Sequence, residues 1–159
     1  MERRLRLAMV LGIVLVMTSI GLAAATPPLG ATATPLVRGT LAEGDKIYTR
    51  FLKLKISDDI DVVTHTITLT PGGHTGWHSH PGPVFVTIAA GTMTFVYADE
   101  PNCTPTVYET GDSFIDPGGG RVHIARNLGS TDLVLSATYL TPVGAAVRID
   151  APDPGRCAA

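Results

Sequence analysis

Two closely spaced histidines, His78 and His80, are the residues of this sequence best suited to chemistry. In an extended strand, residues i and i+2 project from the same face, so both imidazoles would point into whatever space that face covers. An open metal site needs a third protein ligand, and His123 offers one from a separate predicted strand. Paired histidines also occur on solvated surfaces, so this spacing alone leaves a metal site and a plain surface pair both open.

A fourth histidine, His74, lies four residues before His78 and directly follows a Pro-Gly-Gly turn. It is a candidate fourth nitrogen ligand or proton shuttle, because imidazole can serve in either role near neutral pH. The alternative interpretation is a solvated histidine beside a turn. His65 shares strand parity with Ile67 and Leu69, which favours a half-buried packing residue.

The sequence shows no acid–base pair beside these histidines. Glu109, Asp112 and Asp116 fall in predicted turns and are expected at the surface. Arg121 and Arg126 lie near the third histidine and could meet an anionic substrate. Both arginines are expected to be solvated or to form salt bridges. The reaction type is therefore left open by the residues alone.

The elements that must position the histidines are predicted to be short strands. Alternating segments are separated by turns rich in glycine and proline, and the chain has 17 Gly and 12 Pro. No 12-residue stretch of the chain after the leader has a convincing helical period. Eight or more strands at this spacing predict an all-β sandwich or barrel. The expected extended segments are residues 48–56, 62–69, 74–80, 84–90, 92–97, 106–109, 113–115, 122–127 and 133–140.

Residues 1–25 have the pattern of an export signal. Three arginines precede an apolar run at residues 7–25, which ends in three alanines. The run of 19 residues is also near the ~20 needed to span a bilayer, so an uncleaved N-terminal anchor is the alternative. Either interpretation predicts a secreted or extracytoplasmic domain, with a membrane span only if the signal is uncleaved.

The remaining 134 residues suffice for one domain. We expect a flexible lead-in at residues 26–40, a β-barrel domain at 41–150 and a C-terminal tail at 151–159. This part of the chain has 9 basic and 13 acidic residues, and no basic stripe. The charge pattern therefore excludes nucleic acid as an expected partner.

Two cysteines, Cys103 and Cys157, both lie in turn-rich stretches. In an oxidising compartment such a pair usually forms a disulfide, which would tie the tail to a central loop. Idle thiols or a metal role are the alternatives, although no CxxC spacing supports ligation.

Two motifs make the chain resemble the cupin superfamily. The first reads Gly72, five residues, His78-Ser79-His80, three residues, Val84, six residues and Gly91, and departs from the family signature at one position. The second reads Gly111, five residues, Pro117, a glycine run, His123, three residues and Asn127, with one extra residue before the histidine. The resemblance covers residues 62–140 and implies a single-domain jelly-roll barrel. The segments PGGHTGWHSHPGP and DPGGGRVH, with the cysteine pair, also resemble a group of secreted actinobacterial cupin proteins.

The resemblance implies metal ligation by His78, His80 and His123, with the family's glutamate ligand falling on Val84. Three neutral ligands leave a divalent ion its full charge. Such a site favours Fe²⁺, Zn²⁺, Cu²⁺ or Ni²⁺ over hard ions such as Mn²⁺. Some cupin dioxygenases acting on thiols or diketones work with three histidines. The alternative is that Val84 is ordinary core and no metal binds.

These observations predict an extracytoplasmic metal-binding cupin, in its enzymatic form a metal-dependent oxygenase acting on a small organic substrate. The alternative is a non-catalytic barrel that binds a metal or a small ligand. A third interpretation is an inert, stable barrel. The expected partner is a small molecule, and a homodimer is an expectation from the family alone.

Overall fold

The computed structural model describes residues 24–157, so the predicted signal or anchor helix lies outside the described residues apart from Ala24 and Ala25. The described chain is almost entirely β, with one short 3₁₀ turn at Pro101–Cys103. Within it, no helix is long and apolar enough to cross a membrane. The predicted all-β class is confirmed.

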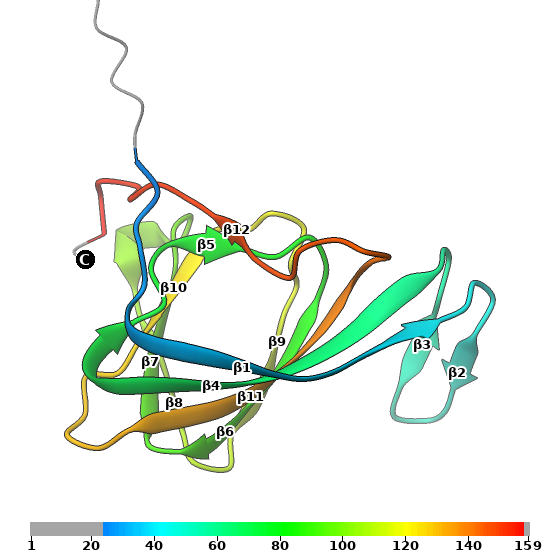
Figure 1. The fold of residues 1–159 in the computed structure, drawn as a ribbon, viewed down its shortest axis with the longest axis horizontal. Coiled ribbons are helices and arrows are strands. Elements are labelled where there is room, and N and C mark those ends of the chain that lie inside the picture. The colour runs from blue at the N-terminus through cyan, green and yellow to red at the C-terminus, as the bar shows by residue number, and fades with distance from the viewer. Residues whose placement is uncertain (1–23, 158–159) are drawn as a thin grey trace, which may run out of the picture.

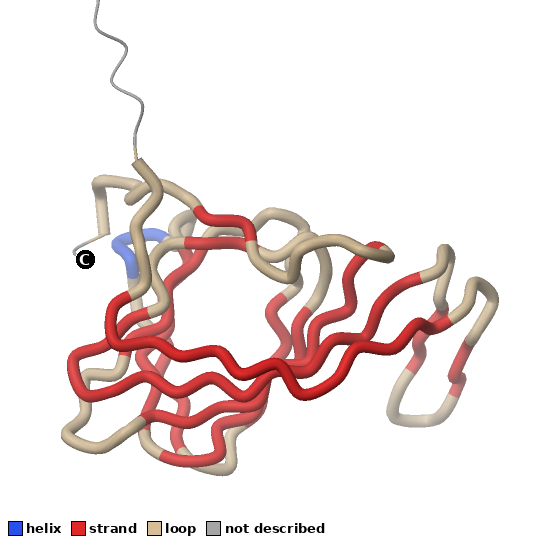
Figure 2. Tube along the Cα trace, viewed as in Figure 1, coloured by secondary structure: helices blue, strands red, loops and turns tan. Residues whose placement is uncertain are grey.

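Ten of the strands join one sheet that wraps into a nearly closed barrel (Figures 1 and 2). Seven of them follow the hydrogen-bonded order β12-β5-β10-β4-β11-β6-β9, while β1 pairs with β4, and β7 pairs with both β10 and β8. The strands are β1 (Leu29–Leu41), β2 (Lys46–Tyr48), β3 (Lys53–Lys55), β4 (Ile60–His74), β5 (His78–Ser79), β6 (Val84–Ala90), β7 (Thr92–Tyr97), β8 (Thr106–Glu109), β9 (Ser113–Asp116), β10 (His123–Arg126), β11 (Leu133–Pro142) and β12 (Ile149–Asp150).

The barrel core forms because the strands alternate between inward apolar and outward side chains. In β11, buried and less buried residues alternate along nearly the whole strand, and the strand pairs with β4 from Leu133↔Leu69 to Pro142↔Ile60. Inward residues of β4, β6, β7 and β11 form the main hydrophobic cluster. The pattern predicted from sequence for residues 133–140 therefore describes the wall of the barrel.

The predicted flexible lead-in at residues 26–40 is wrong. Most of this segment forms β1, which pairs with β4 along its length, from Leu41↔Ile60 to Leu29↔His74. Proline cannot donate to a ladder hydrogen bond, so it is tolerated on edge strands and at bulges. Among the described strands β1 pairs with β4 alone, and its register shifts between Pro35 and Val37. The prolines that suggested a linker are therefore compatible with an edge strand.

The single strand predicted at residues 48–56 is also wrong. β2 and β3 instead form a separate two-stranded ribbon that projects from the barrel (Figure 1). A side-chain turn at Thr49 reverses the chain, because its hydroxyl oxygen accepts hydrogen bonds from the backbone N–H groups of Phe51 (3.2 Å) and Leu52 (2.9 Å). Such local bonds compete with continued strand formation.

A second, smaller hydrophobic cluster holds the C-terminal segment against the barrel. Trp77 is completely buried and packs with Val96, Ile124, Ala151 and Cys157. The predicted disulfide between Cys103 and Cys157 is present and closes this cluster, with 5.4 Å between the two Cα atoms.

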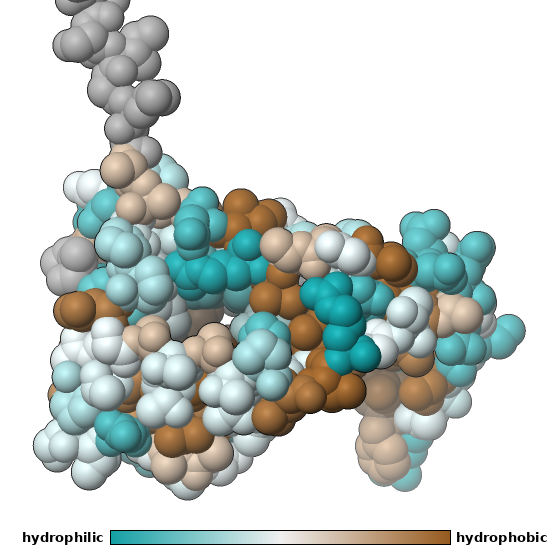
Figure 3. Space-filling model, viewed as in Figure 1, coloured by the Kyte–Doolittle hydropathy of each residue, from teal (hydrophilic) through white to brown (hydrophobic). Residues whose placement is uncertain are grey.

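The surface around β1 mixes polar and apolar side chains, and apolar groups gather on this face near the point where the barrel meets the ribbon (Figure 3). Leu36 and Val37 of β1 are 61% and 63% exposed. These two exposed groups are adjacent on an edge strand. The expected homodimer stays a prediction.

Candidate metal centre

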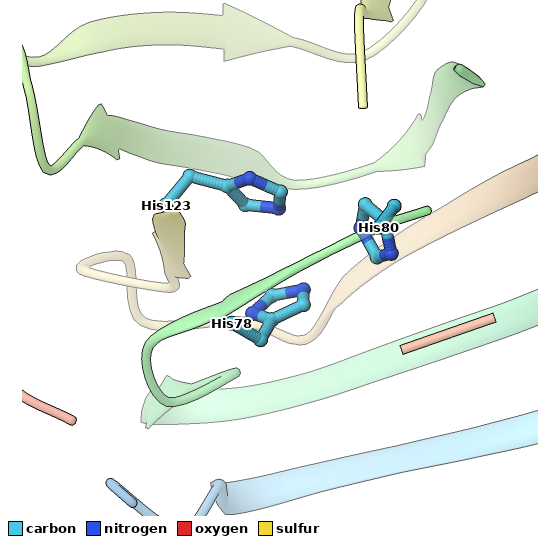
Figure 4. A group of neighbouring side chains, drawn as sticks. All are labelled: His78, His80 and His123. Atoms are coloured by element: carbon cyan, nitrogen blue, oxygen red, sulfur yellow. The ribbon is translucent and has the colours of Figure 1, made fainter. Parts of the chain in front are cut away.

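Two strands at one end of the barrel bring three histidines together. His78 begins β5, His80 follows two positions later, and His123 begins β10. β5 and β10 are antiparallel, with His123 directly opposite His78. The ring centroids are 4.4 Å apart for His78 and His123, 4.9 Å for His78 and His80, and 5.0 Å for His80 and His123. The rings turn toward a common space (Figure 4).

The cluster is buried, and the two ring nitrogens of each histidine have different surroundings. Each histidine is at most 6% exposed, and one ring nitrogen of each lies within 4.8 Å of the others. Every Nδ1 contacts a backbone carbonyl oxygen: that of Gly76 for His78 (2.9 Å), of Val147 for His80 (2.6 Å) and of Arg121 for His123 (3.1 Å).

These contacts define the tautomer of each imidazole. A carbonyl oxygen can only accept a hydrogen bond, so each Nδ1 must carry the proton and donate it. The neutral ring then holds its lone pair on Nε2. Histidine ligands of protein metal sites are commonly oriented in this way, by a hydrogen bond from the nitrogen that does not bind. The donor set therefore fits a divalent transition metal ion.

Burial keeps the three imidazoles uncharged. It lowers the pKa of His78 well below its ordinary value of 6.5, and neighbouring His123 and Arg148 act in the same direction. Burial lowers the pKa of His123 to about 4, although the nearby Asp116 carboxylate opposes this. The pKa of His80 is lowered by burial as well, against the contact with the Val147 carbonyl and the charge of Asp116. Near neutral pH the rings are free to bind a cation.

Two hollows meet at the histidines. An interior cavity of about 40 Å³ lies behind them, and a cleft of about 260 Å³ reaches His78 and His80 from the side of β1. The interior is lined mostly by apolar side chains, including Val84, Val86, Met93 and Phe95. The cleft carries polar groups as well, including His65, Tyr139 and Arg148.

Tyr139 lies between the two hollows and stays protonated. Its ring centroid is 5.1 Å from that of His80, and burial raises its pKa to about 12. His65 is half-buried and places its ring edge against Tyr139, with 5.4 Å between centroids. The predicted packing role of His65 is confirmed, and the residue also lines the cleft.

The structure does not bring His74 into the cluster. This residue ends β4, is half-buried, and its Nδ1 accepts a hydrogen bond from the backbone N–H of Gly76 at 3.1 Å. Among the described residues, the group of neighbouring ligand atoms comprises the other three histidines alone. Arg121 pairs with Asp99 at 3.0 Å and stacks over the Tyr97 ring, as expected of a salt-bridged residue.

Asp116 lies beside the histidine cluster, and the sequence analysis predicted its position wrongly. Predicted at the surface, it ends β9 and is 2% exposed. Its Oδ2 lies 3.6 Å from Nδ1 of His123 and 3.9 Å from Nε2 of His80. The available signal was strand parity, because Asp116 shares a face with Phe114, which packs against the barrel core. The following Pro-Gly run had suggested that the residue already belonged to a turn.

Comparison with known proteins identifies a family whose model matches the part of the chain that carries the histidines. Residues 65–139 match the family model described as a cupin domain. No curated protein gives a significant match. The interval contains all three histidines of the cluster, as well as Val84 and Asp116.

Solved structures with a similar fold include a cupin domain from Bordetella pertussis, which is 20% identical, with 74% of this chain and 98% of that chain covered and a TM-score of 0.48. A cupin-like protein from Thermotoga maritima is 22% identical, and the alignment covers 58% of this chain and 65% of that protein, with a TM-score of 0.49. An oxalate decarboxylase from Lactobacillus farciminis is 18% identical, and the alignment covers 56% of this chain and 26% of that protein, with a TM-score of 0.49.

The family match lies on the elements that build the barrel and the histidine cluster, from within β4 to within β11. The nearly closed all-β barrel has the architecture that the two sequence motifs imply. Residues 65–139 therefore form a cupin domain.

Proposed function

We propose that this protein is an extracytoplasmic metal-binding cupin, in which His78, His80 and His123 hold a divalent transition metal ion through Nε2. The observation that carries this proposal is the common orientation of the three buried rings, with each Nδ1 donating to a backbone carbonyl. Imidazole ligands suit iron, zinc, copper and nickel, and the identity of the ion is left to measurement.

The activity proposed for this site is oxygenation of a small organic substrate. A bound transition ion supplies redox or Lewis-acid chemistry. The cleft of about 260 Å³ gives a small molecule access to His78 and His80. Tyr139 keeps its proton at neutral pH and lines the same cleft, so it can donate a hydrogen bond to a polar group of the substrate.

The extracytoplasmic location is supported by the cysteine pair. Disulfides form and persist in oxidising compartments and are rare where thiols are kept reduced. Cys103 and Cys157 are bonded, and no free cysteine remains among the described residues. The export signal predicted at residues 1–25 supports the same location, independently of the cysteines.

Metal content tests the proposal. The protein is purified from an exporting host without chelators, beside a His78→Ala/His80→Ala variant and a His65→Gln control. Near-stoichiometric metal in the wild type and the control, and its loss from the double variant, are expected. A wild-type protein that stays metal-free after loading with each candidate ion would contradict the proposal.

A non-catalytic binding barrel is the second candidate function. The apolar lining of the interior, with Val84 and Val86 among its residues, favours it because these side chains offer no proton donor or acceptor. Oxygen consumption by the metal-loaded protein, measured across a panel of small organic compounds, separates the two functions. Consumption that depends on substrate identifies an oxygenase, whereas binding without consumption identifies a binding protein.

A further inference from the structure

The carboxylate of Asp116 is buried, and within the described part of the chain only one of its oxygen atoms has hydrogen-bond partners. Oδ1 accepts hydrogen bonds from the Tyr97 hydroxyl (3.1 Å) and the Gly118 backbone N–H (3.3 Å). Oδ2 is buried and has no hydrogen-bond partner among residues 24–157. Leaving a carboxylate oxygen dry and unpaired is strongly unfavourable, so this atom requires a positive partner.

The unpaired oxygen faces the histidine cluster. Oδ2 lies 3.6 Å from Nδ1 of His123, whose proton is directed at the Arg121 carbonyl. It lies 3.9 Å from Nε2 of His80, the nitrogen that keeps its lone pair because Nδ1 donates to the Val147 carbonyl. Two electron-rich atoms therefore face each other across a buried space. With metal–nitrogen and metal–oxygen bonds of about 2.0–2.2 Å, two ligands of one ion are separated by about 3–4 Å. The observed separation is within that range.

The register of the sheet explains how Asp116 reaches this space. β6 and β9 are antiparallel, and Asp116 lies directly opposite Val84. Residues that face each other in an antiparallel pair project to the same side of the sheet. Val84 lines the interior cavity together with the three histidines. β9 therefore presents a carboxylate beside the position where β6 presents only an isopropyl group.

Neighbouring groups hold the carboxylate in this orientation. The Tyr97 hydroxyl binds Oδ1, and the guanidinium of Arg121 covers the Tyr97 ring at 3.5 Å. The turn after Asp116 is anchored at Gly118, which packs directly against the backbone of Gly82. Oδ1 is used to position the side chain, which leaves Oδ2 directed at the cluster.

We propose that Asp116 is the anionic ligand of this metal site, binding the ion through Oδ2 beside the three histidines. This inference rests on the metal-binding function proposed above. It changes the expected metal preference, because a carboxylate neutralises one charge of the ion and adds a hard oxygen ligand. The disadvantage for Mn²⁺ expected from Val84 is then removed by a residue of the neighbouring strand.

Calorimetric titration of the chelator-treated protein with Mn²⁺ and with Zn²⁺ tests the inference. Asp116→Asn preserves the size of the side chain and removes the charge, and exposed Asp132→Asn is the matched control. Loss of Mn²⁺ affinity on the order of 10–100-fold in Asp116→Asn, with a smaller loss for Zn²⁺, is expected. Asp132→Asn should bind both ions like the wild type. Equal Mn²⁺ affinity in wild type and Asp116→Asn would overturn the inference.

A crystal structure of the Zn²⁺-loaded wild type tests the ligand role without a variant. Oδ2 of Asp116 should lie about 2.0–2.2 Å from the ion. An ion bound by the histidines with this oxygen beyond bonding distance would overturn the ligand role, whatever the variant does. A wild type that binds neither ion would instead overturn the proposed function. The two failures are therefore distinguishable.

Discussion

The two nitrogen atoms of each clustered imidazole have different tasks. Nδ1 donates to a backbone carbonyl, which sets the orientation of the ring, and the lone pair of the neutral ring is left on Nε2. Burial makes the charged form of each ring unfavourable. The same burial that prepares the rings for a cation makes the metal-free protein sensitive to acid.

Acid should destabilise the metal-free protein between pH 6.5 and about 4. The pKa of His123 falls from its ordinary 6.5 to about 4 on folding, so within this window the unfolded chain binds more protons than the folded one. Stability therefore rises with pH across the window and is lost as pH falls. We expect the Tm in the presence of a chelator to drop from pH 7 to pH 4, and to drop less in His123→Gln. Parallel pH profiles of the two proteins would contradict this explanation.

Replacement of His74 should leave metal binding intact. Its Nδ1 already accepts a hydrogen bond from the Gly76 backbone N–H, which occupies the lone pair of that nitrogen. We expect His74→Ala to retain the metal stoichiometry and affinity of the wild type, measured by elemental analysis and competition with a chelator. A tenfold or greater loss of affinity, about 1.4 kcal/mol, would restore the role of fourth ligand that the sequence suggested.

At the scale of the elements, the loop between β9 and β10 connects Asp116 to His123. It contains three successive glycines with positive φ, at 67°, 64° and 83° for Gly118, Gly119 and Gly120. Only at Gly118 is a side chain also excluded by contact, because an added Cβ would lie 2.0 Å from the carbonyl oxygen of Gly82. At Gly119 an added Cβ meets nothing within 4 Å.

The two glycines provide a matched pair of variants. Gly119→Ala should lower the free energy of unfolding by about 1–2 kcal/mol, the usual strain of a side chain in the left-handed region. Gly118→Ala should cost more, because the clash with the Gly82 backbone is added to the same strain. Urea denaturation of both variants measures the difference. Equal losses would show that the close approach at Gly118 is unimportant.

At the scale of the whole molecule, the C-terminal segment closes one end of the barrel. β12 pairs with β5, placing Asp150 opposite His78, and the tail then packs into the cluster around Trp77. The disulfide links the end of this segment to the 3₁₀ turn, across a sequence separation of 54 residues. The bond therefore constrains the tail together with the end of the barrel that carries the three histidines.

Removal of the disulfide should be strongly destabilising. A closed loop of this length restricts the unfolded chain by about 4 kcal/mol on the chain-entropy model. We expect a Cys103→Ser/Cys157→Ser variant to lose stability of about this size in urea denaturation under non-reducing conditions. Reduction of the wild type with a thiol should produce a similar loss, and should have no effect on the variant. An unchanged denaturation midpoint in the variant would contradict the prediction.

The sequence by itself was sufficient for the all-β class, the cupin family and the grouping of His78, His80 and His123. Strand alternation places His78 and His80 on one face, whereas His123 joined them through the resemblance of the second motif to the cupin signature. The cysteine pair was also predictable, because few partners were available and the surrounding residues favoured loops. These features depend on local pattern or on motifs that occupy fixed positions.

Tertiary structure alone decided which segments lie beside the histidines. The proline-containing segment before residue 41 became β1 because β4 offered it a free edge. Asp116 became buried because β9 pairs with β6 in a register that places it opposite Val84. A strand's own sequence specifies its two faces but not the residue across the ladder, since that partner is set by the closure of the whole barrel. The charge next to the histidine cluster is therefore a property of the fold.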